Sequence, residues 1–445
     1  MKTTLLKNAT IVNEESSIEC DLLIKNERIE KIESSIPSSD ASQIFDLRGL
    51  HLLPGLIDDQ VHFRQPGYEY KATIETESKA ALAGGITSYL EMPNTKPQTT
   101  TLKAWNNKYE IARNSSYANY GFMFGGTNDN LEEIKRLDFK KVPALKLFLG
   151  SSTGNMLIDN PNILKEIFTN TPIRIALHCE DENTINQNLI KAIALYGDNI
   201  PIGMHPKIRS SEACLKSTRM AVKLAKETGA KIHIFHLSTE DETDFFTNQI
   251  PLSQKQITAE VCLHHLWFSD DDYSSKGTYI KWNPAIKSTA DKKALWKALN
   301  DDRIDVLATD HAPHTKEEKK RPYTSAPSGG PLVQHMLPGL LTFAHRGLIS
   351  IEKIVRKAAH NPAILFDIAD RGFIREGYYA DLVAVDIKKI WTVNSNNLLY
   401  KCQWSPFEGE QFTGWVKYTF VNGNLAYDNG QILETKSAKK LELSR

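Results

Sequence analysis

The chain has 445 residues, which is long enough for one large domain and a smaller one around a sizeable core. Its 54 lysines and arginines equal its 54 aspartates and glutamates, so the formal net charge is zero. This balance argues against nucleic acid or a membrane surface as the main partner. No stretch approaches the roughly 20 consecutive apolar residues that a membrane span needs.

Two further features bear on the cellular compartment. The first 20 residues contain no long apolar run followed by a small-residue cleavage site, so we expect no signal peptide. The five cysteines are scattered along the chain without a CxxC pair, which favours free thiols over disulfides or metal ligands. Both features predict a protein of the reducing cytoplasm.

The two ends of the chain share a strand-like texture. Short alternating runs separated by turn residues fill residues 1–50 and predict a small antiparallel sheet. Similar runs return after about residue 373. We therefore expect residues 1–50 and 374–445 to form one small β-sandwich domain, with the polar tail from Glu434 lying loosely on the surface.

Residues 51–373 alternate between apolar runs and helix-like segments. Eight apolar runs are candidate strands: "LLPGLID", "TSYLEMPN", "NYGFMFGG", "PALKLFLG", "IRIALHCE", "KIHIFHLS", "ITAEVCLHH" and "IDVLATDHA". Helix-like segments lie between them, among them residues 181–195 and 211–228. The alternation predicts an α/β fold, a (β/α)8 TIM barrel over residues 51–373.

Polar side chains gather where these strands end. Active sites of such barrels lie at the carboxyl ends of the strands, so these positions are the candidate site. The residues are Asp58, His62 and Arg64 after the first strand, Asn94 after the second, His178 after the fifth, His236 after the sixth, and Asp310, His311 and His314 after the eighth. Imidazoles converging with a carboxylate are the ligands that zinc prefers.

Each residue taken alone has a simpler structural explanation. A single histidine on an apolar strand is usually a hydrogen-bonded core or surface residue, and Arg64 alone could form a surface salt bridge. Lys146 is harder to explain, because it interrupts an apolar strand and burying an ammonium is costly unless it is neutralised. The joint pattern therefore favours a metal site.

The chain resembles the amidohydrolase superfamily and, within it, the dihydroorotases of the cyclic amidohydrolase group. The motifs that carry the resemblance extend over nearly the whole chain: "GLHLLPGLIDDQVHFRQPG", "AGGITSYLEMPNTKP", "PALKLFLGSSTGNM", "ALHCED", "IFHLST", "TAEVCLHHL", "NPAIK", "LATDHAPHT" and "REGYYADLVAVD". The resemblance implies a zinc-dependent hydrolase that acts on a cyclic amide.

The resemblance also implies a ligand set of one or two zinc ions, bridged by a carboxylated Lys146 if two are bound. His178 and His236 would hold one ion, and His62 and Asp310 the other. The family places a further histidine at position 60, where this chain has Gln60. A carbonyl oxygen is a weaker ligand than imidazole for zinc, so it stays open whether both ions bind.

Four further residues match positions with which dihydroorotases hold their substrate: Arg64, Asn94, Asn283 and His314. An arginine fork suits a carboxylate. The "AIK" that follows "NP" departs from the usual sequence of the family at this point, so the conformation of the loop stays open. Asp310 would take a proton from the metal-activated water and pass it to the leaving nitrogen. The implied reaction is the reversible cyclisation of N-carbamoyl-L-aspartate to L-dihydroorotate in pyrimidine biosynthesis.

Two other functions stay open at this point. Gln60 favours a non-catalytic relative that serves as a scaffold for aspartate transcarbamoylase, and a different cyclic amidohydrolase, such as an allantoinase, would share the metal cage. The scaffold function is less favoured, because all the other site residues are present within their expected motifs. We expect a small-molecule substrate, a homodimer, no nucleic-acid or membrane partner, and leave open a contact with aspartate transcarbamoylase.

Overall fold

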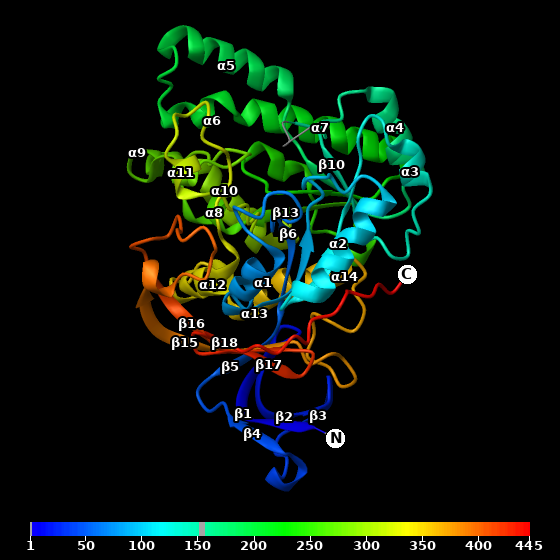
Figure 1. The fold of residues 1–445 in the computed structure, drawn as a ribbon, viewed down its shortest axis with the longest axis vertical. Helices are drawn as coiled ribbons and strands as arrows, with labels where there is room; N and C mark the ends of the chain where they lie inside the picture. The colour runs from blue at the N-terminus through cyan, green and yellow to red at the C-terminus, as the bar shows by residue number, and fades with distance from the viewer. Residues whose placement is uncertain (1, 151–155) are drawn as a thin grey trace.

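The computed structural model describes residues 2–150 and 156–445, so the end of the motif that follows Lys146, residues 151–155, lies outside the described part. Parallel strands form a barrel in the middle of the molecule (Figure 1). They are β6 (Leu56–Val61), β7 (Ile86–Glu91), β8 (Asn119–Phe122) continued by β9 (Phe124–Gly125), β10 (Leu145–Phe148), β11 (Ile175–His178), β12 (Ile232–Ile234), β13 (Ile257–Cys262) and β14 (Val306–Ala308).

The ring closes between its first and last strands. Val61 pairs in parallel with His311, and the backbone N–H of His62 donates to the carbonyl oxygen of His311 at 2.7 Å. The end of β14 is thereby held beside the end of β6. Residues that are about 250 positions apart in the sequence meet at one edge of the barrel.

Helices follow the barrel strands and cover them. They are α1 (Ile74–Ala83), α2 (Leu102–Ser115), α3 (Leu131–Lys135), α4 (Pro161–Asn170), α5 (Glu182–Tyr196), α6 (His205–Ile208), α7 (Ser211–Thr228), α8 (Leu263–Trp267), α9 (Tyr273–Lys276), α10 (Thr289–Asn300), α11 (Lys316–Lys319), α12 (Met336–His345), α13 (Ile351–Val355) and α14 (Asn361–Leu365). Hydroxyl side chains cap several N-termini, as Ser210 does for α7 and Ser288 for α10. None of the helices in the described ranges is long and apolar enough to cross a membrane.

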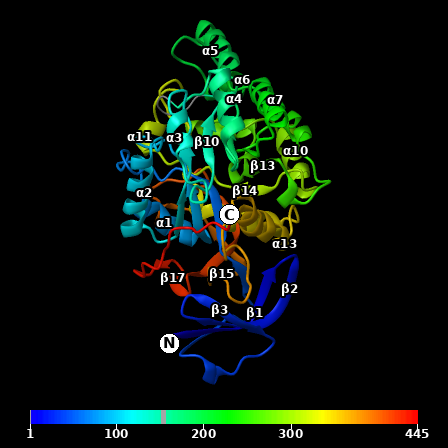
Figure 2. The ribbon, with the colours of Figure 1, turned by 90° about the vertical axis from the view of Figure 1, so that its right-hand side faces the viewer.

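Both chain ends contribute to one nine-stranded sheet, in the order β18-β17-β16-β15-β5-β1-β2-β3, with β4 paired to β1. Its strands are β1 (Thr3–Asn13), β2 (Ser16–Lys25), β3 (Arg28–Glu33), β4 (Gln43–Asp46), β5 (His51–Pro54), β15 (Leu382–Thr392), β16 (Gln411–Val421), β17 (Asn424–Asp428) and β18 (Gln431–Ile432). The predicted fold class, a barrel with a β domain from both ends, is confirmed. Figure 2 shows this domain and α5 at opposite ends of the molecule.

Two details of the fold differ from the sequence predictions. The N-terminal strands are not purely antiparallel, because β1 runs parallel to β4 and β5; residues 34–42 carry the chain back across the sheet, which a tight turn cannot do. The "LHH" that was included in the seventh barrel strand begins α8 instead. The exact domain boundaries stay a prediction, and β5, just after the expected boundary at residue 50, pairs with the end sheet.

The C-terminal tail is not loosely held, so that prediction was wrong. Leu441 is 3% exposed, and its backbone N–H donates to the carbonyl of Tyr120 at 2.9 Å. Arg445 forms an ion pair with Asp367 at 2.7 Å and donates to the carbonyl of Val142. The polar composition of the tail was misleading, because the Arg445 side chain and the Leu441 backbone find hydrogen-bond partners in the rest of the chain.

Candidate functional site

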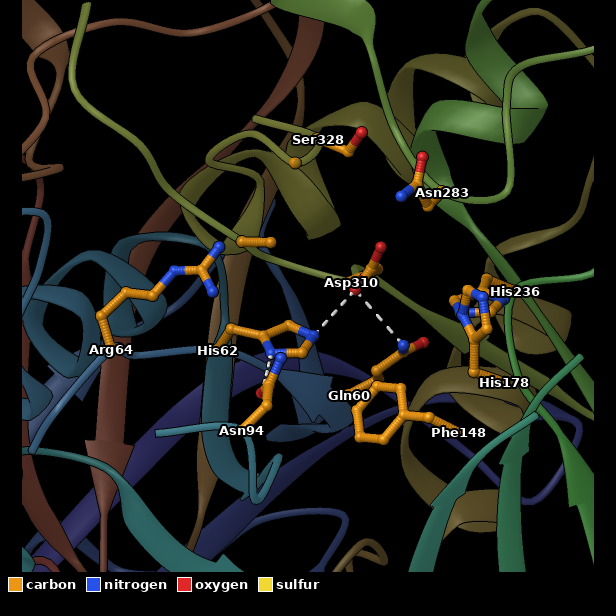
Figure 3. Close-up of a pocket in the computed structure, with 12 residues that line it drawn as sticks. Gln60, His62, Arg64, Asn94, Phe148, His178, His236, Asn283, Asp310 and Ser328 are labelled. Carbon is orange, nitrogen blue, oxygen red and sulfur yellow. Dashed lines mark hydrogen bonds and ion pairs between the residues drawn. The ribbon is translucent and has the colours of Figure 1, made fainter. Parts of the chain in front are cut away.

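A polar cavity of about 80 Å³ lies at the carboxyl ends of the barrel strands (Figure 3). Eight residues that the sequence singled out line it together: Gln60, His62, Arg64, Asn94, His178, His236, Asn283 and Asp310. Phe148, Ala312, Ser328 and Gly329 complete the lining. The structure thus brings most of the predicted site to one place, and the remaining two, Lys146 and His314, lie against it.

His178 and His236 present facing ring nitrogens. Nε2 of His178 lies 2.9 Å from the Glu180 carboxylate, and its Nδ1 lies 3.0 Å from Nε2 of His236. Burial alone would raise the pKa of Glu180, but Arg209 and His178 outweigh it and lower this pKa to about 2. Because the carboxylate is ionised, it accepts the Nε2–H of His178 and turns the Nδ1 lone pair toward His236. Metal-bound histidines are commonly oriented by a carboxylate in this way.

A second pair of ligand atoms forms at His62 and Asp310. Nδ1 of His62 donates to the side-chain oxygen of Asn94 at 2.8 Å, so its Nε2 carries the lone pair. That lone pair faces Oδ1 of Asp310 at 3.2 Å (Figure 3). Burial raises the pKa of Asp310 to about 7. Two electron-rich atoms in such contact need a proton or a cation between them, so this pair also fits a metal.

Gln60 stands beside this pair but offers the wrong end of its amide. Its side-chain NH2 donates to Oδ1 of Asp310 at 3.3 Å, while its oxygen lies 3.9 Å from the thiol of Cys262. Only after a half-turn of the amide would its oxygen face the space between His62 and Asp310. In the present conformation Gln60 therefore competes for Asp310 instead of adding a ligand.

Lys146 is a buried amine without a hydrogen-bond partner in the described part of the chain, at 1% exposure. Its Nζ lies 3.9 Å from the ring centre of Phe235 and 4.8 Å from that of Phe148. Burial lowers the pKa of Lys146 to about 7, so a large share of the amine is neutral at physiological pH. A neutral, unpartnered amine fits the reaction with CO2 that a bridging carboxylated lysine requires.

Arg64 gives one wall of the cavity a positive charge, and His314 and Lys71 lie behind it. Nη2 of Arg64 lies 3.0 Å from Nε2 of His314, and Nζ of Lys71 lies 2.8 Å from the other ring nitrogen. Glu318 pairs with Lys71 at 2.9 Å and neutralises part of that charge. Burial lowers the pKa of His314 well below its ordinary value, so the ring stays neutral between the two cations. This wall suits a carboxylate of a small ligand.

Three of the site residues have strained backbones. Arg64, His236 and Asp310 adopt φ angles of 68°, 41° and 51°, in the left-handed region that non-glycine residues avoid. Each such residue costs on the order of 1–3 kcal/mol, and such strain concentrates at functional sites. The three residues follow the ends of β6, β12 and β14 by two or three positions, and all three line the same cavity.

The sequence reasoning missed one group of residues. Asp59, His233 and Glu260 are buried and place one ligand-type atom each within 4.8 Å of the others, close enough to hold a metal ion. Glu180 and Lys71, which hold His178 and His314, were also missed. The available signal was a titratable residue within an apolar run, as in "KIHIF" and "ITAEV".

Comparison with known proteins gives a consistent result. The model of the amidohydrolase family matches residues 51–426. A protein named dihydroorotase from Methanosarcina mazei is 32% identical, with 95% of this chain and 93% of that protein covered. Another from Halobacterium salinarum is 34% identical, with 93% and 94% covered. Among solved structures, the L-hydantoinase (dihydropyrimidinase) of Arthrobacter aurescens superimposes with a TM-score of 0.93 at 26% identity, over 99% of this chain and 100% of the other.

Proposed function

Since this chain belongs to the amidohydrolase family, we propose that it is a dihydroorotase, which interconverts N-carbamoyl-L-aspartate and L-dihydroorotate in pyrimidine biosynthesis. The observation that carries the proposal is the cationic wall that Arg64 forms beside the histidines and the carboxylate of the cavity, with Lys71 behind it against His314. Dihydroorotate differs from hydantoin and dihydrouracil in its ring carboxylate, for which this wall provides a partner.

The metal is proposed to be zinc, held by His62, His178, His236 and Asp310, with a carboxylated Lys146 as the bridge if two ions bind. The support is the facing ring nitrogens of His178 and His236, the close pair of His62 and Asp310, and the unpartnered amine among the described residues. When bound, such an ion supplies Lewis-acid chemistry, which activates water and polarises an amide carbonyl. Gln60 is the reason to expect that the ion near His62 and Asp310 binds more weakly than the other.

The chain's own residues account for binding and proton transfer. Arg64 would hold the substrate carboxylate, together with the amide N–H of Asn94, whose oxygen is already used by His62. The side-chain oxygen of Asn283 has no partner in the described ranges and can accept a ring N–H. Asp310 would take the proton of the attacking water and give it to the ring nitrogen as the carbon–nitrogen bond breaks.

A substrate panel tests the proposal. The full chain is purified with zinc and assayed with dihydroorotate, hydantoin, dihydrouracil and allantoin, with metal content measured on the same sample. We expect dihydroorotate to be turned over with the highest kcat/KM. A preference for a ring without a carboxylate would indicate another cyclic amidohydrolase, which the hydantoinase-like structure makes the main competitor.

The scaffold function gives a different result in the same assay. If the metal-loaded chain turns over none of the four substrates but binds aspartate transcarbamoylase, the scaffold function replaces the enzyme function as the proposal. The homodimer, this partner contact and the cytoplasmic location stay predictions, which size-exclusion chromatography and co-purification can test.

A further inference from the structure

A second group of ligand-type side chains lies within the barrel strands. Asp59 of β6, His233 of β12 and Glu260 of β13 each direct one ligand atom toward the others, all within 4.8 Å. All three side chains have no solvent exposure. None of them is among the residues that line the cavity of Figure 3.

The hydrogen bonds of His233 determine which of its nitrogens faces this group. The hydroxyl of Thr258 donates to the carbonyl of Ile232 at 3.1 Å, so its oxygen accepts the hydrogen on Nδ1 of His233 at 2.9 Å. Nε2 therefore carries the lone pair. It faces Oε2 of Glu260 at 3.3 Å and Oδ2 of Asp59 at 3.5 Å.

In the parts of the chain that the structure describes, no lysine or arginine forms an ion pair with Asp59 or Glu260, and the charge of the buried Lys146 acts on both carboxylates without direct contact. Both carboxylate oxygens of Asp59 lack a hydrogen-bond donor there. Lys146, the nearby buried amine, also has no partner among those residues. Two buried carboxylates beside a single amine that pairs with neither of them are unfavourable unless a further cation binds between them.

The distances from His233 distinguish a metal ion from a proton shared between the imidazole and a carboxylate. A charge-assisted hydrogen bond between imidazole and carboxylate has a length of about 2.7–2.9 Å. The observed 3.3 and 3.5 Å are longer. Four ligands at about 2.1 Å from a tetrahedral ion lie about 3.4 Å from one another. The two distances from His233 match this ligand spacing, and the ligand atoms of Asp59 and Glu260 lie within 4.8 Å of each other.

We propose that Asp59, His233 and Glu260 bind a divalent ion of the zinc class at a structural site inside the barrel, separate from the centre at its mouth. The two carboxylates and one dication sum to zero charge, which makes deep burial feasible. One imidazole with two carboxylates suits zinc-like ions, whereas magnesium and calcium prefer oxygen ligands alone.

The site has a consequence for the candidate active site. The other oxygen of Glu260, Oε1, accepts the backbone N–H of His236 at 3.2 Å. An ion that fixes the Glu260 carboxylate therefore also fixes the backbone of His236, which has a strained φ of 41°. Glu260 is a positioning residue for His236 in this arrangement.

Anomalous diffraction tests the site without any variant. Crystals of the full chain are soaked in zinc at neutral pH, and data are collected above and below the zinc edge. We expect an anomalous peak about 2.1 Å from the three ligand atoms. Absence of a peak there after saturating zinc overturns the proposal. Anomalous peaks at the barrel mouth lie apart from this site and are scored separately. The dihydroorotase function is tested by the substrate assay, so it can fail while the peak at Asp59, His233 and Glu260 is present.

Metal content in solution provides a second test. In a chain with His178→Ala and Asp310→Asn, which weakens the mouth centre, we expect about one tightly held zinc per chain. Adding Asp59→Asn should remove it. The matched control is Glu242→Gln, since Glu242 is a buried carboxyl hydrogen-bonded to Thr218 and Thr239 elsewhere. Zinc that persists in the Asp59→Asn chain, or that is lost equally in the control, overturns the proposal.

Discussion

At the scale of single residues, Gln60 is the feature that most distinguishes this site. A histidine in its place would present an imidazole where the structure has an amide that donates to Asp310. The neighbouring His62 and Asp310 still face each other at 3.2 Å, and His178 and His236 keep their own arrangement. One altered ligand therefore leaves both pairs intact.

Gln60→His should strengthen metal binding at the pair of His62 and Asp310. Imidazole is a better zinc ligand than an amide, so we expect at least a roughly tenfold lower Kd for the weaker ion. Competition with a chromophoric chelator measures both ions in one titration. Gln60→Leu serves as the control, and an unchanged Kd in the histidine variant would show that position 60 does not face the metal.

Arg64→Met should lower kcat/KM for dihydroorotate by roughly 10–100-fold, the equivalent of losing a charged hydrogen bond of about 1.5–3 kcal/mol. Any hydantoin turnover should fall much less, because hydantoin has no carboxylate to lose a partner. Lys71 contacts His314 and does not itself line the cavity, so Lys71→Met should lower kcat/KM for dihydroorotate less than Arg64→Met does. Equal losses on both substrates would argue against carboxylate recognition by Arg64.

At the scale of elements, the segment of residues 310–331 connects the last barrel strand to the cavity. Nζ of Lys319, in α11, donates to the carbonyls of Pro327 and Gly329 at 2.9 and 2.8 Å. Lys281 similarly donates to the carbonyls of Tyr323 and Ala326. These buried amines hold a chain segment that has little regular structure of its own and that contributes Ser328 and Gly329 to the cavity.

Lys319→Met should loosen this segment. The variant leaves two buried carbonyls without their donor, so we expect faster amide hydrogen exchange across residues 320–331 and a higher KM for dihydroorotate. In the unaltered chain, bound dihydroorotate should slow exchange in the same segment, because Ser328 and Gly329 line the cavity and we expect the segment to cover the substrate. Exchange that is insensitive to both the substitution and the ligand would contradict that role.

Individual elements also show how far sequence patterns reach. The helix predicted over residues 211–228 is observed as α7 at Ser211–Thr228, because Ser210 caps its start and Gly229 ends it with a φ of 79°. The helix of α8 was missed, since "LHH" continues an apolar run and carries no start signal. The sequence therefore predicts a helix that has capping residues and an apolar periodicity, as α7 does. It does not predict a short helix such as α8, which depends on tertiary packing.

At the scale of the whole molecule, Glu180 and Arg209 form a buried ion pair that connects fold stability to pH. The folded pKa of Glu180, about 2, lies below its ordinary value of 4.5. A lowered carboxyl pKa stabilises the fold above pH 4.5, and the contribution is lost as the pH falls from 4.5 toward 2.

Glu180→Gln should therefore lower the free energy of unfolding by about 3–5 kcal/mol near neutral pH, because Arg209 loses its buried partner. The difference in Tm between the two proteins, measured with chelator present, should shrink as the pH is lowered below 4.5. A difference that stays constant from pH 7 to pH 3 would mean that the pair does not titrate as described.

The sequence by itself determined the family resemblance, the α/β class and ten of the residues that meet at the barrel mouth. It could do so because strand ends are marked by local patterns and all barrel strands point their carboxyl ends to one side. The tertiary structure decided what those residues do to one another. The amide orientation of Gln60, the tautomers of His62 and His233, and the convergence of Asp59 with Glu260 all depend on contacts between strands that are far apart in sequence.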